Sequence, residues 1–598
     1  MAYTASRAGS VNSTVKRVRT WYALLLLVIG IFGVRLFYLQ VIRYDHYKTA
    51  ALHDQLHQKV IPATRGTIEA HDGEKTIPIV LNQKLYTVFA DPVDIKTYKT
   101  DVDKAAVRLA STLGGEVDGY AKKLQAKDTR YVILAKKVTP EQRTKLLSYK
   151  LAGLYSEERD YRTYPQGSMA AQVLGFVSDE GQGDYGLEQA LNKQLAGTPG
   201  ELKAITDQSG VPLAASRGNV QTAPKNGDDL VLTVNMGMQA QLERILADQY
   251  KKTKSKGLSA VIMDPATGKI KAMANYPSYD PAKYSEVNDP KIFENASVSE
   301  AIEPGSTMKL LTAAAALDQG VIKPDTTYFD PSKFVIDDFT VKNIEEDGGA
   351  RQQSIASVLN LSLNTGATWM LMQMGGGSIN TKARTAWYDY LTSHFQFGND
   401  SNIEQGYETA GLVTKPANNG AGINLTYANM SFGQGILVTP LQMTAAVSSI
   451  INGGTYYQPY LVDSTTDSNG KTTTTKPKVV KQNVVSPEVS RAMIPLMEYI
   501  VDEHYKEGFS YLNFSDSYAV GGKTGTAQIA NPSGGYYADK YNGTYTGFVG
   551  GNDAQYVITV FNTQPSVNGY AGSYGGQPIF GDIAHMLIDN GYVTPKTR

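Results

Sequence analysis

The chain has 598 residues, no cysteine, and 57 basic against 57 acidic side chains. This length exceeds what one hydrophobic core requires, so we expect two or more folded units. The balanced charge gives no global basic field for nucleic acid, and the lack of cysteine excludes thiol nucleophiles, cysteine metal sites and disulfide scaffolds. We therefore expect no nucleic-acid partner, and any catalysis must use side chains other than cysteine. We also expect no metal and no cofactor.

An apolar segment near the N-terminus predicts a membrane anchor. Residues 21–42 are apolar apart from a few polar positions such as Arg35, and as a helix they span about 33 Å, enough to cross a bilayer. The short segment before them is basic and has no acidic residue, so the positive-inside rule places residues 1–20 in the cytoplasm and the rest of the chain outside. A cleaved signal peptide is the alternative, but no small-x-small cleavage site follows. We expect a single-pass protein of the cell membrane.

Residues 43–230 predict an α+β pedestal. The sequence is polar and mixed, with a strand-like run at 85–90 and a helical stretch at 105–113. A second domain is expected over 231–598. It begins with a helix at 236–250, followed by two strands at 258–264 and 269–274 around the turn residues 265–268.

The C-terminal part returns to strands, predicted at 517–519, 545–550 and 555–561. With the hairpin at the start of the domain, they predict an antiparallel sheet assembled from both ends around a helical insertion, an α+β architecture with a cleft where the two parts meet. The polar tract 464–475 is typical of a solvated loop.

The first motif that carries chemistry is Glu303-Pro304-Gly305-Ser306-Thr307-Met308-Lys309, directly before an apolar stretch that ends near Gly320. Pro and Gly mark a turn, so Ser306 is expected in the first turn of a buried helix with Lys309 on the same face. A serine hydroxyl attacks only when a base takes its proton, and a lysine desolvated at a helix N-terminus is suited to this. A helix cap followed by a surface lysine is the alternative, since Ser468 to Lys471 shows the same pattern in a loop.

Two later motifs strengthen the catalytic interpretation. Ser362-Leu363-Asn364 offers a hydroxyl that can relay a proton and an amide that can orient a peptide. Beside a predicted strand, the run 521–526 contains Lys523, Thr524, Gly525 and Thr526, in which glycine permits close approach and the other side chains can bind a carboxylate. Ser-x-Asn occurs elsewhere in the chain, whereas Lys-Thr-Gly occurs once. Three motifs in this order make a chance match improbable.

In these motifs the sequence resembles the penicillin-binding proteins, whose Ser-x-x-Lys, Ser-x-Asn and Lys-Thr-Gly motifs line one cleft. The resemblance extends over most of residues 230–590 and includes 264–268, 433–435, 439–442 and 452–454. Segments 65–68, 159–167 and 186–188 look like the N-terminal dimerisation module of class B members and are interpreted as structural. The run after Ser362 and that after Thr439 look more like division-type than elongation-type members.

The resemblance implies a penicillin-binding/β-lactamase-like fold and a peptidoglycan D,D-transpeptidase. Ser306 would attack the bond between the last two D-alanines of a stem peptide, with Lys309 as base and Ser362 as proton relay. Backbone N–H groups of Ser306 and Thr526 would form the oxyanion hole. Asn364, Lys523, Thr524, Gly525 and Thr526 would bind substrate. The implied partners are stem peptides, β-lactams, a polytopic glycan polymerase and other division proteins.

Other activities share the same motifs. A serine β-lactamase is shorter, soluble and equipped to hydrolyse its acyl-enzyme, and the anchor and pedestal argue against it. A β-lactam sensor or a catalytically inactive scaffold would carry signalling segments or lose a motif member, but every motif residue is present here. A bifunctional class A enzyme needs a glycosyltransferase domain, for which residues before 230 give no sign.

Overall fold

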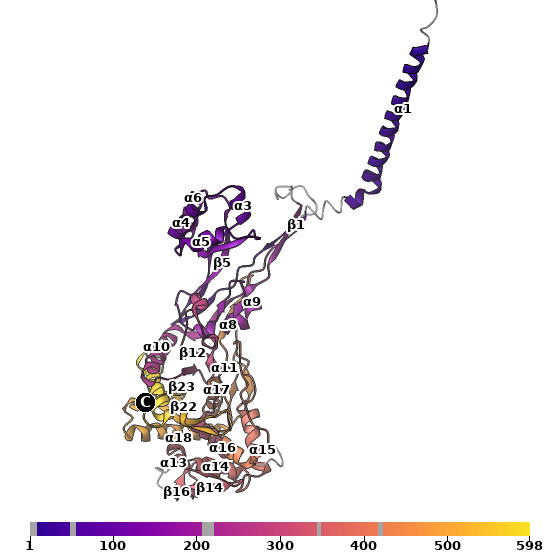
Figure 1. Cartoon of the computed structure of the whole chain (residues 1–598). Helices are drawn as coiled ribbons and strands as arrows, with labels where there is room; N and C mark the ends of the chain where they lie inside the picture. Colours follow the sequence, from indigo (N-terminus) through magenta and orange to yellow (C-terminus); the bar gives the residue numbers. More distant parts are fainter. Residues whose placement is uncertain (1–8, 48–55, 206–219, 344–348, 417–421, 598) are drawn as a thin grey trace, which may run out of the picture. The chain divides into compact units, whose positions relative to one another are not determined.

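The computed structural model describes residues 9–47, 56–205, 220–343, 349–416 and 422–597 (Figure 1). The chain divides into two units. The first comprises Met1–Ala63 and Gly197–Asn226, and the second comprises Thr64–Ala196 and Gly227–Arg598.

The first unit contains a long apolar helix and a small sheet. Helix α1, Gly9–Phe37, continues into a π-helical turn, η1, Tyr38–Ile42. Val15–Ile42 includes the predicted span and is, among the described residues, the one helix long and apolar enough to cross a membrane. It starts before residue 21 because the polar flank contains no proline to interrupt it. Strands β1 Leu56–Ile61, β8 Gly200–Ile205 and β9 Val220–Thr222 pair in the order β1-β8-β9.

A seven-stranded sheet joins distant parts of the second unit. Its order is β19-β18-β10-β2-β3-β4, and β5 also pairs with β3. β10 is parallel to β2 and antiparallel to β18, so the N-terminal and C-terminal parts share one sheet. The predicted strand at 85–90 is confirmed as the end of β3. The bounds are β2 Ile68–Asp72, β3 Lys75–Ala90, β4 Val132–Val138, β5 Leu154–Thr163, β10 Asp229–Asn235, β18 Val462–Thr466 and β19 Thr472–Thr474.

Four helices accompany the β3-β4-β5 part of this sheet: α3 Pro92–Thr97, α4 Val102–Leu113, α5 Val117–Leu124 and α6 Pro140–Ser148. Leu109 and Leu124 are buried in one core with Val88 and Leu134 of the strands. The predicted helix at 105–113 is confirmed within α4, which starts at a side-chain cap from Asp101.

Arg65, Arg162 and Glu188 form a buried cluster of charged side chains in this part of the unit. Glu188, on α8 Gly186–Ala190, is fully buried and accepts from Arg65 Nε at 2.7 Å and from Arg162 Nε at 2.8 Å. The three residues come from the segments 65–68, 159–167 and 186–188, which the structure brings together. The carboxylate hydrogen-bonds both guanidinium groups and thereby holds the three segments together.

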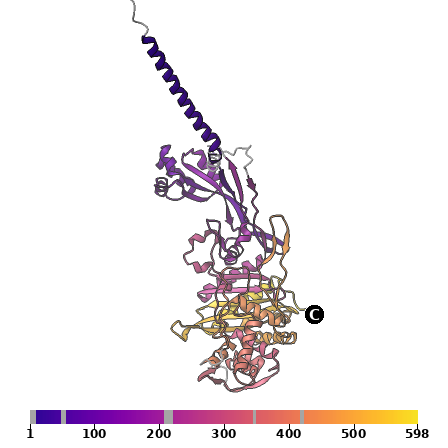
Figure 2. The same ribbon diagram turned by 90° about the vertical axis from the view of Figure 1, so that its right-hand side faces the viewer.

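The C-terminal sheet is built from both ends of the domain, as predicted, in the antiparallel order β12-β11-β23-β22-β21. Ala260 and Ile262 of β11 belong to the core beneath α10 and α19, whereas Val261 and Met263 belong to the core that contains α17, as the alternation of a strand requires. Figure 2 shows magenta and yellow strands from the two ends in one layer. The bounds are α10 Met236–Thr253, β11 Gly257–Met263, β12 Ile270–Tyr276, β21 Ala519–Ala530, β22 Tyr536–Gly550, β23 Ala554–Thr563 and α19 Gln577–Asp589.

Between β12 and β21 lies the predicted helical insertion. Helix α17 is buried along its whole length, and α12 is buried from Met308 to Leu317. Figure 1 shows α13 to α16 beside the strands β14 and β16 at one end of the unit. The helices are α11 Ala296–Ser299, α12 Met308–Asp318, α13 Ile355–Asn360, α14 Asn364–Met374, α15 Thr381–Asp389, α16 Ile423–Ser431, α17 Pro440–Ile451 and α18 Pro487–Lys506. The strands are β13 Thr327–Asp330, β14 Lys333–Ile336, β15 Phe339–Lys342 and β16 Arg351–Ser354.

Short elements complete the described chain: α7 Ala171–Leu174, β6 Phe176–Val177, β7 Gly183–Asp184, α9 Asn192–Ala196, η2 Pro281–Glu286, η3 Pro290–Phe293, η4 Gly305–Thr307, η6 Tyr390–His394, β17 Tyr456–Tyr457, β20 Val479–Lys481, η7 Ser510–Leu512 and η8 Gly572–Gly576.

Two predictions of local structure are wrong. The tract 464–475 is not a loop, because β18 and β19 form a hairpin over most of it, closed by a turn at Asp467 and Gly470. Its threonines are β-branched and favour strands, which outweighs their polarity. The strand predicted at 517–519 begins only at Ala519 and continues to Ala530, so the Lys-Thr-Gly motif lies within a strand rather than beside one.

Candidate active site

Ser306 lies in the short helical turn η4, which leads directly into α12. Gly305 before it has a φ of +60°, and its N–H donates to the carbonyl of Gly433 at 3.0 Å. A Cβ at Gly305 would lie 2.9 Å from the carbonyl oxygen of Thr526. Glycine is therefore required at 305 both for the left-handed backbone and for close packing against β21. Ser306 itself is partly exposed, as a nucleophile that must meet a substrate has to be.

Lys309 is fully buried on α12, and its ammonium contacts the second motif. Nζ donates to Asn364 Oδ1 at 2.8 Å, to Ser362 Oγ at 3.2 Å and to the carbonyl of Ser362. The structure thus brings together Lys309, Ser362 and Asn364, which are 55 residues apart at most in the sequence. Ser306 lies one turn before Lys309 on the same chain segment, so two of the three motifs meet here.

The backbone of Ser362 has an uncommon conformation. Its φ is +59°, in the left-handed region that non-glycine residues seldom occupy. Ser362 stands between the end of α13 and the start of α14, where Leu363 is fully buried and anchors the connection. In this conformation both the carbonyl and the hydroxyl of Ser362 contact Lys309. A strained residue of this kind persists where the surrounding structure over-determines it, and such residues cluster at active sites.

The third motif lies in β21, the edge strand of the sheet, which packs against η4. Lys523 is fully buried, and its Nζ lies 3.2 Å from Thr524 Oγ1. A Cβ at Gly525 would lie 2.2 Å from Thr544 Oγ1 and 2.5 Å from the Pro304 carbonyl, so glycine permits β21 to approach the nucleophile segment. Thr526 Oγ1 accepts from the N–H of Gly572 at 2.9 Å. All three motifs therefore belong to one region of the second unit.

Two residues to which the sequence motifs assign no role also lie in this region. Glu303 Oε1 accepts from the N–H of Gly435 at 2.7 Å and from the hydroxyl of Tyr536 at 2.8 Å, and burial raises the pKa of its carboxyl group. His504 on α18 is buried and lies 2.6 Å from Gln577 Nε2 through Nδ1. Burial, with a smaller contribution from the positive charge of Lys523, lowers the pKa of His504 to about 4. Sequence reasoning gave neither residue a role, and only the three-dimensional contacts reveal them.

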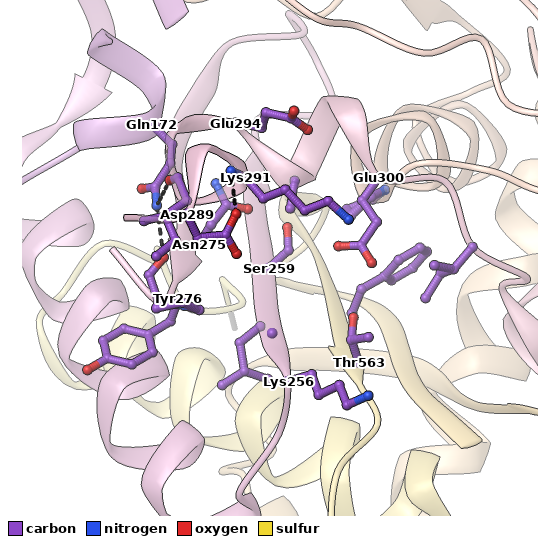
Figure 3. Close-up of a pocket in the computed structure, with 18 residues that line it drawn as sticks. Gln172, Lys256, Ser259, Asn275, Tyr276, Asp289, Lys291, Glu294, Glu300 and Thr563 are labelled. Carbon is purple, nitrogen blue, oxygen red and sulfur yellow. Dashed lines mark hydrogen bonds between the residues drawn. The ribbon is translucent and has the colours of Figure 1, made fainter. Parts of the chain in front are cut away.

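A separate pocket opens beside β11, β12 and β23, near the opposite edge of the sheet (Figure 3). It has a volume of about 220 Å³, and its lining includes Lys256, Ser259, Asn275, Lys291 and Glu300 but none of the motif residues. In Figure 3 the side chain of Lys291 extends toward Glu300 across the upper part of the pocket. The pocket is therefore distinct from the region of Ser306. Within the described ranges, no group of three or more histidine or acidic side chains is arranged to bind a metal ion.

Comparison with known proteins identifies the family of the chain. Residues 258–585 match the model of the penicillin binding protein transpeptidase domain, and residues 60–232 match that of the penicillin-binding protein dimerisation domain. Stage V sporulation protein D of Bacillus subtilis is 30% identical over 593 residues, which cover 98% of this chain and 88% of the relative. The chain belongs to the class B penicillin-binding proteins.

Other relatives of this class B protein agree. The peptidoglycan D,D-transpeptidase FtsI of Escherichia coli is 26% identical over 575 residues, covering 96% of this chain and 91% of the relative. The crystal structure of penicillin binding protein 2X from Streptococcus thermophilus superimposes with a TM-score of 0.70 at 24% identity, covering 90% of this chain and 80% of that one. The predicted α+β fold is confirmed, and the protein is a serine-type transpeptidase with one N-terminal helix suited to a membrane anchor.

Proposed function

We propose that this protein is a peptidoglycan D,D-transpeptidase that crosslinks stem peptides through an acyl-enzyme on Ser306 and releases D-alanine. The observation that carries the proposal is the contact of the fully buried Lys309 with Ser362 and Asn364, one turn after Ser306. In the absence of a histidine, a lysine that is removed from water and lies close to a serine can act as the base that takes the proton of the serine hydroxyl.

In the acylation step Ser306 Oγ attacks the carbonyl carbon of the penultimate D-alanine while its proton passes to the neutral amine of Lys309. Ser362 Oγ lies 3.2 Å from Lys309 Nζ and relays a proton to the nitrogen of the departing D-alanine. The peptide C–N bond breaks, and an ester to Ser306 forms. In the second step an amine of a neighbouring strand attacks this ester, loses a proton to the same relay, and frees Ser306.

The third motif would bind the donor peptide. β21 has β22 as its one strand neighbour among the described strands, so its outer edge can pair with an extended peptide by strand addition. Lys523 and the hydroxyls of Thr524 and Thr526 would bind the terminal carboxylate, with Gly525 permitting the approach. Backbone N–H groups of Ser306 and Thr526 would form the oxyanion hole, and Asn364 would orient the peptide as well as contact Lys309.

The organisation of the chain agrees with this function. We propose a cytoplasmic tail over 1–20, a membrane anchor over 21–42, a pedestal over 43–230 and an extracytoplasmic transpeptidase domain over 231–598. We also propose a role in septal wall synthesis, with β-lactams as inhibitors and a polytopic glycan polymerase and other division proteins as partners.

The test is turnover of a defined donor. The full-length protein in detergent is incubated with a peptide ending in D-alanyl-D-alanine and an amine acceptor, and both released D-alanine and the new amide are quantified. We expect both products in equal amounts from the wild type and neither from Ser306→Ala. Release of D-alanine without amide formation, or product from Ser306→Ala, would contradict the proposal.

The β-lactamase and the sensor are distinguished by the fate of the acyl-enzyme. Hydrolysis needs a base that activates a water at the acyl carbon. The one glutamate of the motifs, Glu303, accepts hydrogen bonds from Gly435 and Tyr536, and we do not assign it this role. We expect the penicillin adduct of the wild-type protein to persist after a pulse. Deacylation at an ordinary enzyme rate, on the order of 1 per second or faster, would identify a β-lactamase instead. A persistent adduct without any transfer to amine would identify a sensor.

A further inference from the structure

Next to the Ser362-Asn364 motif lies a polar cluster that consists of Asp330, Asn343 and Thr365. Asp330, at the end of β13, is 1% exposed, and Thr365, in the first turn of α14, is fully buried. Thr365 Oγ1 lies 2.8 Å from Asp330 Oδ2 and 2.9 Å from Asn343 Oδ1, and the N–H of Thr365 donates to Asn343 Oδ1 at 3.0 Å. Asp330 also accepts from Asn343 Nδ2 at 2.9 Å through Oδ2 and from the N–H of Ser332 at 2.9 Å through Oδ1.

This cluster is one residue away from the catalytic contacts. Asn364, directly before Thr365, accepts from Lys309 Nζ through Oδ1 and donates through Nδ2 to the carbonyl of Lys342 at 3.3 Å. Lys342 ends β15 and is followed by Asn343, so the same hairpin contacts both Asn364 and Thr365. One turn further along α14, Trp369 stacks on Tyr328 of β13 with ring centroids 4.2 Å apart. The start of α14 is therefore attached by side chains to β13 and to the end of the β14-β15 hairpin.

We propose that Asp330 and Thr365 are positioning residues that fix the first turn of α14 and thereby the contact of Asn364 with Lys309. This inference rests on the proposed function. Because α14 begins at the catalytic motif, its first turn has no preceding helical turn to restrain it. The orientation of Asn364 then depends on what the next residue contacts, and Thr365 contacts the buried carboxylate of Asp330 and the amide of Asn343.

The chemistry of Asp330 makes the proposal specific. Both of its carboxylate oxygens accept hydrogen bonds. Oδ1 accepts from the N–H of Ser332, and Oδ2 accepts from Asn343 Nδ2 and from the hydroxyl of Thr365. An asparagine has one acceptor oxygen, so in either orientation its amide would face a donor. A valine at 365 keeps the shape of threonine but lacks the hydroxyl, whereas a serine keeps the hydroxyl.

A matched control is present at the opposite end of the β14-β15 hairpin, in the turn between its two strands. Asp337 follows β14 and accepts from the N–H of Asn424 at 2.7 Å and of Leu425 at 3.1 Å, at the start of α16. Asp337→Asn therefore also removes a carboxylate from a helix start, but from a helix that carries none of the three motifs.

The experiment measures acylation of the full-length protein in detergent by a fluorescent penicillin, resolved into the dissociation constant of the first complex and the first-order acylation constant. Asp330→Asn and Thr365→Val should lower the acylation constant about ten- to a hundredfold with the dissociation constant unchanged. Thr365→Ser and Asp337→Asn should keep the wild-type acylation constant, and thermal unfolding establishes that each variant is folded.

The outcomes separate the two proposals. Folded Asp330→Asn or Thr365→Val with wild-type acylation would overturn the positioning role, and so would an equal loss in Asp337→Asn. If Asp330→Asn fails to fold, Thr365→Val against Thr365→Ser decides, because these two differ by the hydroxyl. A wild-type protein that no penicillin acylates would contradict the proposed function itself.

Discussion

Buried charge occurs in two different settings in this protein. In the pedestal, Glu188 is fully buried and bonded to two arginines, Arg65 and Arg162. In the transpeptidase domain, Lys309 is equally buried, but it donates to a carbonyl, a hydroxyl and an amide oxygen, all of them uncharged.

The difference indicates what each site is suited to do. An ion pair in a region of low dielectric stabilises the charged form of each partner, so neither partner readily gains or loses a proton. The contacts of Lys309 Nζ include the hydroxyl of Ser362, a group that can both accept a proton and pass it on. The pedestal cluster is therefore suited to stability and the Lys309 site to proton transfer.

The largest expected effect comes from removing the base. Lys309→Met should lower the rate of penicillin acylation by about a thousandfold or more, because Ser306 then has no proton acceptor. The free energy of unfolding should fall by only about 1–3 kcal/mol, because the oxygen atoms of Ser362 and Asn364 lose this donor. Stopped-flow acylation and urea unfolding measure the two quantities. Acylation at the wild-type rate would exclude Lys309 as the base.

In the pedestal we expect a loss of stability without a loss of acylation. Glu188→Gln leaves Arg65 and Arg162 buried without their carboxylate and should lower the free energy of unfolding by about 3–5 kcal/mol. Acylation of the folded protein, measured well below the melting temperature, should be unchanged. A loss of acylation as large as that of Lys309→Met would show that the two regions are not independent.

A third variant makes the catalytic site resemble the pedestal. Asn364→Asp places a carboxylate where Lys309 now meets an amide oxygen 2.8 Å away. The charge favours the protonated lysine, so we expect acylation at pH 7 to fall at least about tenfold and to recover as the pH rises. A pH profile of acylation with the same midpoint as the wild type would show that Lys309 does not titrate in the step.

The smallest effect concerns His504, which is buried near Lys523 and has a pKa lowered to about 4. The unfolded chain binds a proton near pH 6.5 and the folded chain does not, so stability falls as the pH decreases from about 6.5 toward 4. Between pH 7 and 5 this contributes a loss of about 2 kcal/mol. Urea unfolding at both pH values should show this loss in the wild type and a smaller one in His504→Gln. Identical losses would mean that His504 remains charged when folded.

Much of the site could be predicted because its parts are local in sequence. Ser306 with Lys309, and Ser362 with Asn364, are each spaced within one turn of chain, and the hairpin of β11 and β12 shows both its alternation and its turn residues. The sequence predicts a strand that ends before the Lys-Thr-Gly motif, because glycines disfavour strands in general. In the structure the strand continues through the motif, and its glycines permit β21 to lie against η4.

The parts of the site that could not be predicted depend on contacts between distant segments. The left-handed backbone of Ser362 results from the junction of α13 and α14, and no pattern around it indicates a positive φ. Asp330 and Thr365 are 35 residues apart, and each reads in the sequence as an ordinary turn or helix-start residue. His504 is a single histidine in an amphipathic helix, and its relation to Lys523 appears only when α18 packs on β21.

The most direct test of Ser306 as the nucleophile is to locate the penicillin adduct. The full-length protein is labelled with penicillin, digested, and analysed by tandem mass spectrometry, beside Ser306→Ala treated in the same way. We predict one modified peptide, with the added mass on Ser306, and no modification of the variant. A stable adduct on another residue, or equal labelling of Ser306→Ala, would contradict the assignment of Ser306 as the nucleophile.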